Sequence, residues 1–347
     1  MKSYSIAVLP GDGAGPEVIR EGQRAVEAVA DNFSIEWVSY PYGAAHYLRT
    51  GETLPDQAVE EISALNAVYL GPFGNPKVSR SVIERHLLRK LRNSLDQFAE
   101  VMPVKLYPNV KTPFANVMPG DVDLLIVRDN TEDFQVGIGG SFWKGTPGEI
   151  AVQAGVVSKK GSQRVIGYAF GLAKKEKRKR VTSCDKADIM PHSYGLWRKV
   201  LCEEAKKHKK LNVKLELIND LIPTLAANPS KYEVIVAPSL FGDILLEIGA
   251  MLQGGRGMSF CSDVSERGIC SFKALAMPEA PKGRVNPLGA ALSGALMLEH
   301  LGERKAAGRI RKAIWELLGE GKARTEDIGG SSTTGEVGSA LEKKLIR

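Results

Sequence analysis

The sequence predicts an α/β fold made of about two domains. Short runs of β-branched and aliphatic residues alternate with longer stretches of helical pattern along the chain, and this alternation is typical of strands layered with helices. The chain has 347 residues, which corresponds to roughly two domains at about 150 residues each. Hydrophobic residues make up 43% of the chain and charged residues 25%, the composition of an ordinary globular protein.

These patterns define the expected elements in order. We expect strands over residues 6–9, 67–70, 124–127, 181–184, 214–218 and 234–237. We expect helices over residues 16–32, 79–96, 193–207, 288–301 and 304–320. The glycine-rich stretch 137–148 interrupts the alternation and predicts a protruding arm, which is either a mobile loop or a contact in a dimer.

The composition excludes several classes of protein. The apolar runs, such as residues 234–237, are far shorter than the roughly 20 residues of a membrane span, and the first apolar stretch is too short for a signal peptide. The four cysteines form no Cys-x-x-Cys pair, which argues against a disulfide framework and a structural zinc site. We therefore expect a cytoplasmic protein with no membrane contact.

Positive charge is concentrated in two clusters, residues 174–180 and 206–210, in a chain of net charge +7. Neither cluster lies near the aromatic residues or recognition motifs typical of nucleic-acid-binding proteins. Both coincide with the ends of expected helices, where basic side chains complement the helix dipole. We interpret them as solvated helix ends and expect no nucleic-acid partner.

A glycine-rich turn, residues 11–17, follows the first strand and opens the first helix. Free N–H groups at such a turn can bind an anion. The dinucleotide-binding fingerprint is incomplete, however, because Pro16 occupies the place of its third glycine. An ordinary strand-to-helix turn with proline at the first helical position explains the pattern equally well.

A group of acidic residues predicts a metal site. Asp243 and Glu247 are four residues apart, so on a helix their carboxylates share one face. Asp220 could supply a third oxygen ligand. Oxygen ligands of this kind suit Mg²⁺ or Mn²⁺; the alternative is an exposed acidic helix face.

Basic residues supply candidate anchors and a candidate acid–base group. Arg92 and Arg128 could hold carboxylates through their planar guanidinium groups, and Arg89 lies on the same helical face as Arg92. Lys186 has Asp188 close in sequence. Taken singly, each of these is equally an ordinary surface residue.

The order of these motifs identifies a family. The chain resembles the β-decarboxylating dehydrogenases of the isocitrate, 3-isopropylmalate, homoisocitrate and tartrate/malate types. The segments that carry the resemblance are residues 9–18, 88–99, 126–132, 186–190, Asp220, 241–245, 286–287 and 324–330. Each segment is a modest match by itself, whereas their joint order is specific to this family.

The resemblance implies an α/β fold of two domains with a central cleft and a dimer arm. The first, cofactor-side domain would comprise residues 1–98 plus 250–347. The second would comprise residues 99–249 and carry the dimer contact, with its arm at about residues 137–158. Dimers of the family build each active site from both subunits, so Lys186 and Asp220 would reach the partner's cleft.

The resemblance also implies the reaction, an NAD(P)-linked oxidative decarboxylation of a small 2-hydroxy acid bearing a 3-carboxylate. A hydride would pass from C2 to the nicotinamide, and Mg²⁺ or Mn²⁺ would act as a Lewis acid while CO₂ departs. Lys186 would take part in the acid–base steps. The metal ligands would be Asp220, Asp243 and Glu247, and the substrate carboxylates would be held by Arg89, Arg92 and Arg128.

Two departures from the family pattern affect the substrate side. Gln135 stands where the family has a tyrosine that protonates the enol, and a carboxamide cannot act as an acid near pH 7. Residues 99–103 read Ala-Glu-Val-Met-Pro instead of Ala-Asn-x-Arg-Pro, so Met102 replaces an arginine that binds carboxylate. Arg89 could compensate, because homoisocitrate enzymes carry an arginine at the matching place.

The cofactor side departs further. Asp188 replaces an asparagine that touches the nicotinamide end, and residues 272–287 lack the family's His-Gly pair. In this stretch only Pro278-Glu279 resembles the family's Pro-Asp pair. In that place Glu279 would accept ribose hydroxyls, which favours NAD without excluding NADP. Asn286, in the Asn-Pro element, is the remaining candidate cofactor residue.

Two functions remain open from the sequence. One is an active, homodimeric oxidative decarboxylase with an altered substrate. The other is a catalytically degenerate family member that acts as a regulatory or binding subunit, in a hetero-oligomer with a catalytic paralogue. The retained metal, lysine and arginine set favours the first, and Gln135, Met102 and the missing His-Gly pair favour the second.

Overall fold

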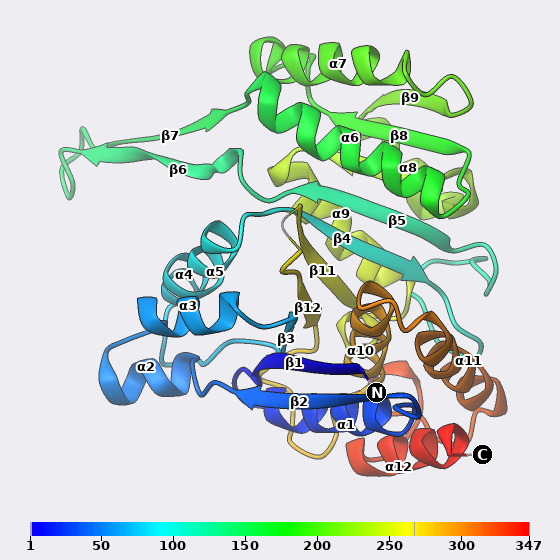
Figure 1. The fold of residues 1–347 in the computed structure, drawn as a ribbon. Coiled ribbons are helices and arrows are strands. Elements are labelled where there is room, and N and C mark those ends of the chain that lie inside the picture. Colours follow the sequence, from blue (N-terminus) through cyan, green and yellow to red (C-terminus); the bar gives the residue numbers. More distant parts are fainter. Residues whose placement is uncertain (1, 267, 347) are drawn as a thin grey trace.

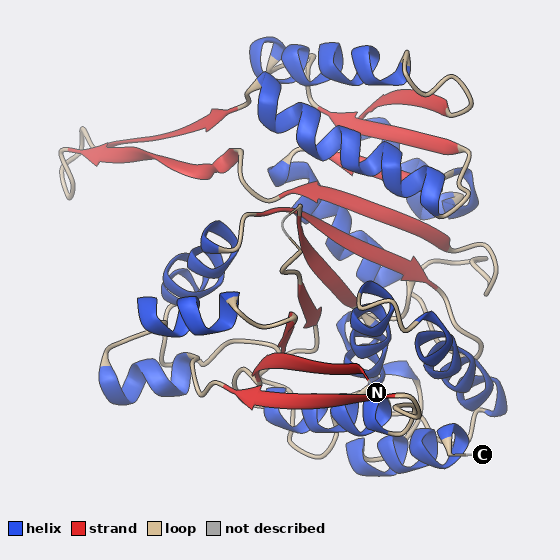
Figure 2. Ribbon diagram, in the orientation of Figure 1, coloured by secondary structure: helices blue, strands red, loops and turns tan. Residues whose placement is uncertain are grey.

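A ten-stranded sheet runs through the whole molecule. The computed structural model describes residues 2–266 and 268–346. The strand order is β2-β1-β3-β12-β11-β4-β5-β10-β8-β9, and helices lie against the sheet along its length (Figure 2). The strands of this sheet are β1 Lys2–Leu9, β2 Phe33–Ser39, β3 Ala67–Leu70, β4 Gln97–Lys105, β5 Asp123–Asp129, β8 Arg180–Asp185, β9 Asn212–Leu217, β10 Val234–Ala237, β11 Phe260–Ser265 and β12 Ser271–Ala274.

The sheet consists of two parallel halves joined by antiparallel strands. Strands β2, β1, β3 and β12 are mutually parallel, as are β5, β10, β8 and β9. Strand β11 pairs antiparallel with β12 and β4, and β4 pairs antiparallel with β5. Strands β4 and β11 therefore connect the halves, and their side chains lie at the middle of the molecule.

The helices follow the strands closely in sequence, as expected for an α/β protein. They are α1 Gly15–Glu27, α2 Ala44–Thr50, α3 Asp56–Ser63, α4 Arg80–Ile83, α5 Arg89–Ser94, α6 Lys159–Lys175, α7 Pro191–Ala205, α8 Ile218–Ala227, α9 Ser239–Leu252, α10 Leu288–His300, α11 Arg304–Glu320 and α12 Thr334–Leu345. A π-helical segment, Glu84–Leu88, joins α4 to α5. Within the described residues, no helix is long and apolar enough to cross a membrane.

The predicted elements are confirmed, with two corrections at their boundaries. All six expected strands are present, and so are the five expected helical regions. The helix expected over 16–32 ends at Glu27, because the chain turns there and enters β2 at Phe33. The helix expected over 79–96 is divided by the π-helical segment Glu84–Leu88.

The arm is a two-stranded antiparallel hairpin of β6 (Asp133–Phe142) and β7 (Ile150–Val156). It projects away from the rest of the molecule (Figure 1), which confirms the expected protrusion. Six of its large apolar side chains are more than 40% exposed, namely Ile138, Phe142, Trp143, Ile150, Val152 and Val156. An isolated hairpin of this kind is marginally stable in water.

Helix α9 lies unusually close to the sheet because glycines face the strands. A Cβ atom at Gly249 would come within 2.8 Å of Val104 and 2.9 Å of Ile126, and one at Gly242 would come within 2.2 Å of the Arg128 side chain. Helix α9 packs against β4, β5, β6 and β10. The close approach at Gly242 brings the next residue, Asp243, onto the Arg128 guanidinium.

Candidate active site

Charged side chains gather on one face of the four central strands. Glu100 of β4 lies directly opposite Arg128 of β5 and directly opposite Asp263 of β11. Lys273 of β12 lies opposite Cys261 of β11. Cys261 is two residues before Asp263, so their side chains share one face of the strand. Residues that face one another across a sheet lie within contact distance, so the register alone brings these charges together.

Lys273 bridges two buried carboxylates. Its Nζ lies 2.7 Å from Oε1 of Glu100 and 2.9 Å from Oδ2 of Asp263. All three residues are at most 7% exposed. Glu100 and Asp263 would repel each other across the strands, and the shared ammonium removes that repulsion. We call Glu100, Arg128, Asp263 and Lys273 the central charge network.

The network holds its groups in their ionised forms. Burial raises the pKa of the Glu100 carboxyl, but Lys273, Arg128 and Arg92 outweigh it and hold that pKa well below its ordinary value. Burial lowers the pKa of the Lys273 ammonium, but Asp263 and Glu100 outweigh it and raise that pKa. Cys261 donates an S–H hydrogen bond to Glu100 over 2.8 Å, and burial raises the pKa of its thiol.

Arg128 is held on three sides. Its Nη2 lies 2.9 Å from Oε2 of Glu100, and its Nε donates to Oδ1 of Asn130 over 3.2 Å. Its Nη1 pairs with Asp243 at the start of α9. The guanidinium is therefore fully engaged, and a ligand carboxylate could bind it only after Asp243 moves away.

Arg92 is buried beside the network. Its Nη1 donates to Oε1 of Glu84 over 2.8 Å, and its Nε lies 3.5 Å from Oδ2 of Asp263. Among the described residues this buried Nε has no hydrogen-bond partner, although it lies within ion-pair distance of Asp263.

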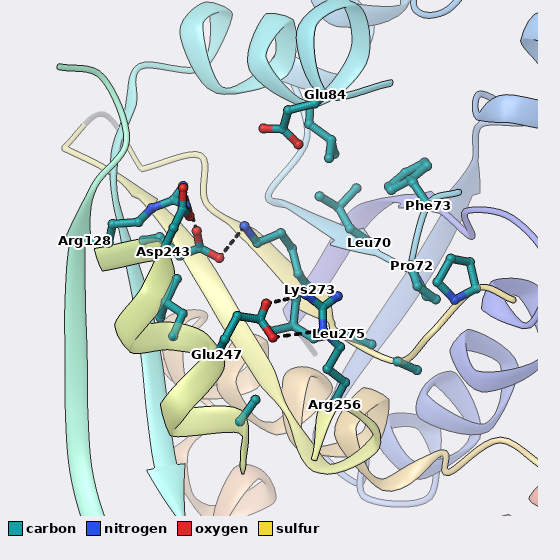
Figure 3. Close-up of a pocket in the computed structure, with 18 of the residues that line it drawn as sticks. Leu70, Pro72, Phe73, Glu84, Arg128, Asp243, Glu247, Arg256, Lys273 and Leu275 are labelled. Atoms are coloured by element: carbon teal, nitrogen blue, oxygen red, sulfur yellow. Dashed lines mark hydrogen bonds and ion pairs between the residues drawn. The ribbon is translucent and has the colours of Figure 1, made fainter. Parts of the chain in front are cut away.

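A cavity of about 370 Å³ opens over the network, and we call it the charged pocket. Arg128 and Asp243 lie at one side of it, Glu247 pairs with Arg256 at another, and the Lys273 side chain extends toward Arg128 (Figure 3). The charged residues of its wall are Glu84, Arg92, Glu100, Arg128, Asp243, Glu247, Arg256 and Lys273.

The charges of the charged pocket balance almost completely. The four cations of its wall face four carboxylates, and Asp263 beneath them adds a fifth negative charge. A substrate with two carboxylates would therefore meet a site that carries no positive excess. A divalent cation bound at the acidic residues would supply that excess.

An adjoining pocket of about 430 Å³ shares Phe73, Leu88 and Pro278 with the charged pocket. Its wall includes Glu279, which lies 3.5 Å from Arg80. The two pockets also share Glu84 and Arg256, so they adjoin along this wall.

The glycine-rich turn serves as packing beside these pockets. Within it, the N–H of Asp12 donates to Pro72 and the N–H of Ala14 donates to Pro278. Gly13 has φ +58°, and a Cβ there would come within 2.0 Å of the Pro278 carbonyl oxygen. The amides at these two positions are therefore used inside the protein, which supports the strand-to-helix-turn interpretation over the anion-binding one.

The charged pocket brings together five of the residues that the sequence predicted, namely Arg92, Arg128, Gln135, Asp243 and Glu247. Asp243 and Glu247 lie one turn apart on α9, with side chains 47% and 56% exposed. Met102 is fully buried beneath α9, 3.7 Å from where a Cβ of Gly249 would lie.

Three further predicted residues lie nearby but outside the charged pocket. Nη2 of Arg89 donates to the Val136 carbonyl over 3.0 Å, at the base of the arm. Glu279 lines the adjoining pocket. Asn286 is buried, and it bonds to Asp327 and to the amide of Leu288 at the start of α10.

The remaining predicted residues lie in the other half of the sheet. Lys186 follows β8, and its Nζ lies 2.8 Å from Oδ2 of Asp188. The hydrogen bond from Lys186 lowers the pKa of the Asp188 carboxyl. Asp220 is exposed in the first turn of α8 and lines a separate surface hollow with Lys214 and Lys231.

A metal site is not complete within one chain. Across residues 2–266 and 268–346, no three His, Cys, Asp or Glu side chains are grouped so that they could hold a metal ion. Asp243 and Glu247 fit two positions of such a site, because their oxygens are hard ligands one helical turn apart. A third ligand of such a site would have to come from outside this group.

Sequence reasoning missed five charged residues of this site: Glu84, Glu100, Arg256, Asp263 and Lys273. Strands β4, β11 and β12 were not predicted, because charged and small polar residues interrupt their apolar pattern. The useful signal was charge inside short strand-like runs, Glu100 within 97–105 and Lys273 within 271–274. Such charges indicate buried pairing when the strands are neighbours.

A cavity at the centre of an α/β sheet with several convergent charged groups is the default candidate for an active site. Residues 5–341 match the family model described as isocitrate/isopropylmalate dehydrogenase. The 3-isopropylmalate dehydrogenase of Thermobifida fusca (strain YX) is 35% identical, with 99% of this chain and 98% of that protein covered. That of Corynebacterium glutamicum is 37% identical, with 98% and 99% covered.

Solved structures agree. The isocitrate dehydrogenase from Methylococcus capsulatus has a TM-score of 0.88 at 29% identity, with 99% of this chain and all of that chain covered. The TT0538 protein from Thermus thermophilus has a TM-score of 0.86 at 29% identity, covering 99% of this chain and 68% of that one. The chain belongs to the isocitrate/isopropylmalate dehydrogenase family, which confirms the predicted family, fold and dehydrogenase class.

Replacing Lys273 by methionine should destabilise the fold by about 3–5 kcal/mol, because two buried carboxylates lose their shared cation. In the double variant with Glu100→Gln, the loss of unfolding free energy should be smaller than the sum of the two single losses by at least about 1 kcal/mol. Urea unfolding of the two single variants and the double variant measures the coupling. Lys282→Met, at an exposed lysine, is the matched control, and strictly additive losses would contradict the bridge.

The depressed pKa of Glu100 predicts a specific acid sensitivity. Because its folded pKa lies below its unfolded value, its stabilisation is present above about pH 4.3 and is lost as the pH falls further. The difference in unfolding free energy between wild type and Glu100→Gln should therefore shrink below about pH 4.3. Urea titrations between neutral and acidic pH test this, and a difference independent of pH would refute it.

Proposed function

We propose that this protein is a metal-dependent, NAD-linked dehydrogenase that oxidises and decarboxylates a 2-hydroxy acid bearing a carboxylate on C3, of the isopropylmalate or isocitrate type. The observation that carries the proposal is the charged pocket, where Arg92, Arg128, Asp243 and Glu247 meet. Family membership supports the reaction class. The relatives' substrates guide the choice of acids to test.

Asp243 controls access to Arg128 in this proposal. Asp243 can pair with the Arg128 guanidinium, as observed, or it can turn with Glu247 to a divalent cation. When Asp243 turns away, Arg128 is released for a substrate carboxylate, and Arg92 in the same pocket wall would bind the same molecule. Bound there, Mg²⁺ or Mn²⁺ would supply Lewis-acid stabilisation of charge on the substrate oxygens.

The partner subunit completes the site. Apolar side chains are exposed beside the acidic residues, including Leu240, Ile244 and Met251 of α9, which are 40%, 42% and 43% exposed. The arm exposes a second apolar group. We propose a homodimer in which these surfaces are buried, and in which Asp220 and Lys186 of the partner subunit reach the charged pocket as metal ligand and acid–base group.

The adjoining pocket is the proposed cofactor site. Glu279 would accept hydroxyl groups of an NAD ribose, and the dinucleotide would lie along the loop that carries Pro278. Arg80, 3.5 Å from Glu279, is the side chain that would meet the extra phosphate of NADP. Both cofactors therefore belong in the assay.

Three broader expectations belong to the same proposal. The division into residues 1–98 plus 250–347 and residues 99–249 would let the halves of the sheet close over the substrate. Gln135 lines the charged pocket but cannot donate a proton as an acid, so water would protonate the enol. The protein would work in the cytoplasm.

Purified protein should reduce NAD, measured as nicotinamide absorbance, when Mn²⁺ or Mg²⁺ and a suitable acid are present. The panel comprises isocitrate, 3-isopropylmalate, homoisocitrate, tartrate and malate. Lys186→Ala should lower kcat by about 10²- to 10⁴-fold, while Mn²⁺ affinity, measured by electron paramagnetic resonance, stays nearly constant. Lys210→Ala, at an exposed lysine outside the proposed site, is the control. No turnover across the panel, with NAD or NADP, would contradict the proposal and leave the regulatory-subunit alternative.

If the metal site is shared between subunits, a substitution that disrupts the dimer should also weaken metal binding. Ile244→Lys places a charge in the proposed interface one residue from Asp243, so it should convert the dimer to monomer. Light scattering should show the halved mass, and Mn²⁺ binding should weaken at least about tenfold. Leu48→Lys, at a residue of α2 that is 49% exposed, should change neither quantity. Full Mn²⁺ affinity in a monomer would show that one chain suffices.

A further inference from the structure

A second cavity lies on the opposite face of the central strands. Its volume is about 640 Å³, larger than that of the charged pocket. We call it the back pocket, and the residues that matter for its chemistry are Lys105, Tyr107, Lys175, Phe272, His300 and Trp315. In Figure 1, α6 lies above β5, and α10 and α11 lie below β4. These three helices contribute to the wall of the cavity together with the two strands.

Strand alternation separates the back pocket from the charged pocket. Successive side chains of a strand point to opposite faces. On β4, Glu100 lines the charged pocket whereas Val101 and Lys105 line the back pocket. On β12, Lys273 lines the charged pocket and Phe272 the back pocket. The back pocket is therefore a distinct site.

Aromatic rings form much of its wall. The rings of Tyr107 and Trp315 lie 5.8 Å apart and those of Phe272 and His300 lie 5.5 Å apart. Tyr107 and Phe272 are buried, whereas Trp315 remains 38% exposed. An indole ring left partly open beside a cavity offers a flat apolar surface for a second ring.

The wall of the back pocket carries one more positive than negative charge. Arg178 pairs with Asp123, Arg311 with Glu299, and Lys312 lies 3.7 Å from Glu316. These three pairs account for all of the pocket's charged residues except the cations Lys105 and Lys175 and the carboxylate Glu176.

The two remaining lysines therefore exceed the one remaining carboxylate. In the part of the chain that the structure describes, neither lysine has an ion-pair partner. The ammonium of Lys105 lies over the Trp315 ring, 5.3 Å from its centre. One of the two positive charges is therefore next to an aromatic ring of the wall. Lys175 also belongs to the first basic cluster, which the proposed reaction does not use.

We propose that the back pocket binds a small aromatic monocarboxylate. Its ring would stack against Trp315, and its carboxylate would replace solvent at Lys105 and Lys175. The cavity volume falls within the range of small-molecule sites, and the single excess positive charge matches a single carboxylate. The citrate-like acids of the charged pocket are flexible and multiply charged, so they fit this wall poorly.

The probe is 2-naphthoate, with 2-naphthalenemethanol as its uncharged analogue. Calorimetry should show saturable binding of 2-naphthoate to the full-length protein at or below about 1 mM, the affinity typical of a ligand with so few atoms. Intrinsic tryptophan fluorescence should be quenched with the same midpoint. The uncharged analogue should bind at least about fivefold more weakly.

Three variants locate the binding. Trp315→Ala should weaken 2-naphthoate binding at least about tenfold, whereas Trp315→Phe should preserve the affinity and remove the quenching. The double variant Lys105→Gln/Lys175→Gln should weaken the carboxylate about fivefold and leave the alcohol unchanged. Lys209→Gln/Lys210→Gln removes the same charge from the second basic cluster, outside the back pocket, and should have no effect.

The opposite results overturn the proposal. Absence of saturable binding would do so, as would binding that Trp315→Ala leaves intact. Equal weakening by both lysine pairs would mean general attraction to a basic surface. Loss of binding in Arg92→Gln with normal binding in Trp315→Ala would assign the probe to the charged pocket. None of these results depends on the protein having dehydrogenase activity.

Discussion

The site depends on one interaction, the shared ammonium of Lys273 between the buried carboxylates of Glu100 and Asp263. Without that cation, two negative charges would face each other across β4 and β11, where burial makes repulsion strong. With it, Glu100 stays ionised and holds Arg128 from below. The two halves of the sheet can therefore be joined by strands that carry buried charged side chains. These paired side chains form a rigid base for the charged pocket.

The same interaction explains why the charged pocket is nearly neutral. Glu100 and Asp243 both engage Arg128, so the guanidinium is poised beneath the pocket but is not free. Asp243 would then pair either with the Arg128 guanidinium or with a bound divalent metal ion. Substrate carboxylates and a divalent ion would bind cooperatively, because the charge of each attracts the other into the pocket.

The sequence predicted the strands on both sides of the sheet's centre, but it missed the edge strand β2 and the central strands β4, β11 and β12. Strands such as β10 (Val234–Ala237) are uninterrupted apolar runs, and periodicity finds them. Strands β4, β11 and β12 were missed because Glu100, Asp263 and Lys273 look unsuitable for a core until their cross-strand pairing is known. Arg92, Arg128, Asp243 and Glu247 were found by residue type and family pattern and do share a pocket. The engagement of Arg128 by Asp243 was not predictable, because it depends on how closely α9 approaches the sheet at Gly242.

The most direct test of the central claim is anomalous diffraction from crystals grown with Mn²⁺ and a 2-hydroxy acid that the protein binds. We predict an anomalous peak within about 2.3 Å of carboxylate oxygens from Asp243 and Glu247 of one subunit and Asp220 of its partner, with Asp243 detached from Arg128 and the acid's carboxylate in its place. A peak elsewhere, or an Asp243–Arg128 pair that persists beside bound acid, would contradict it.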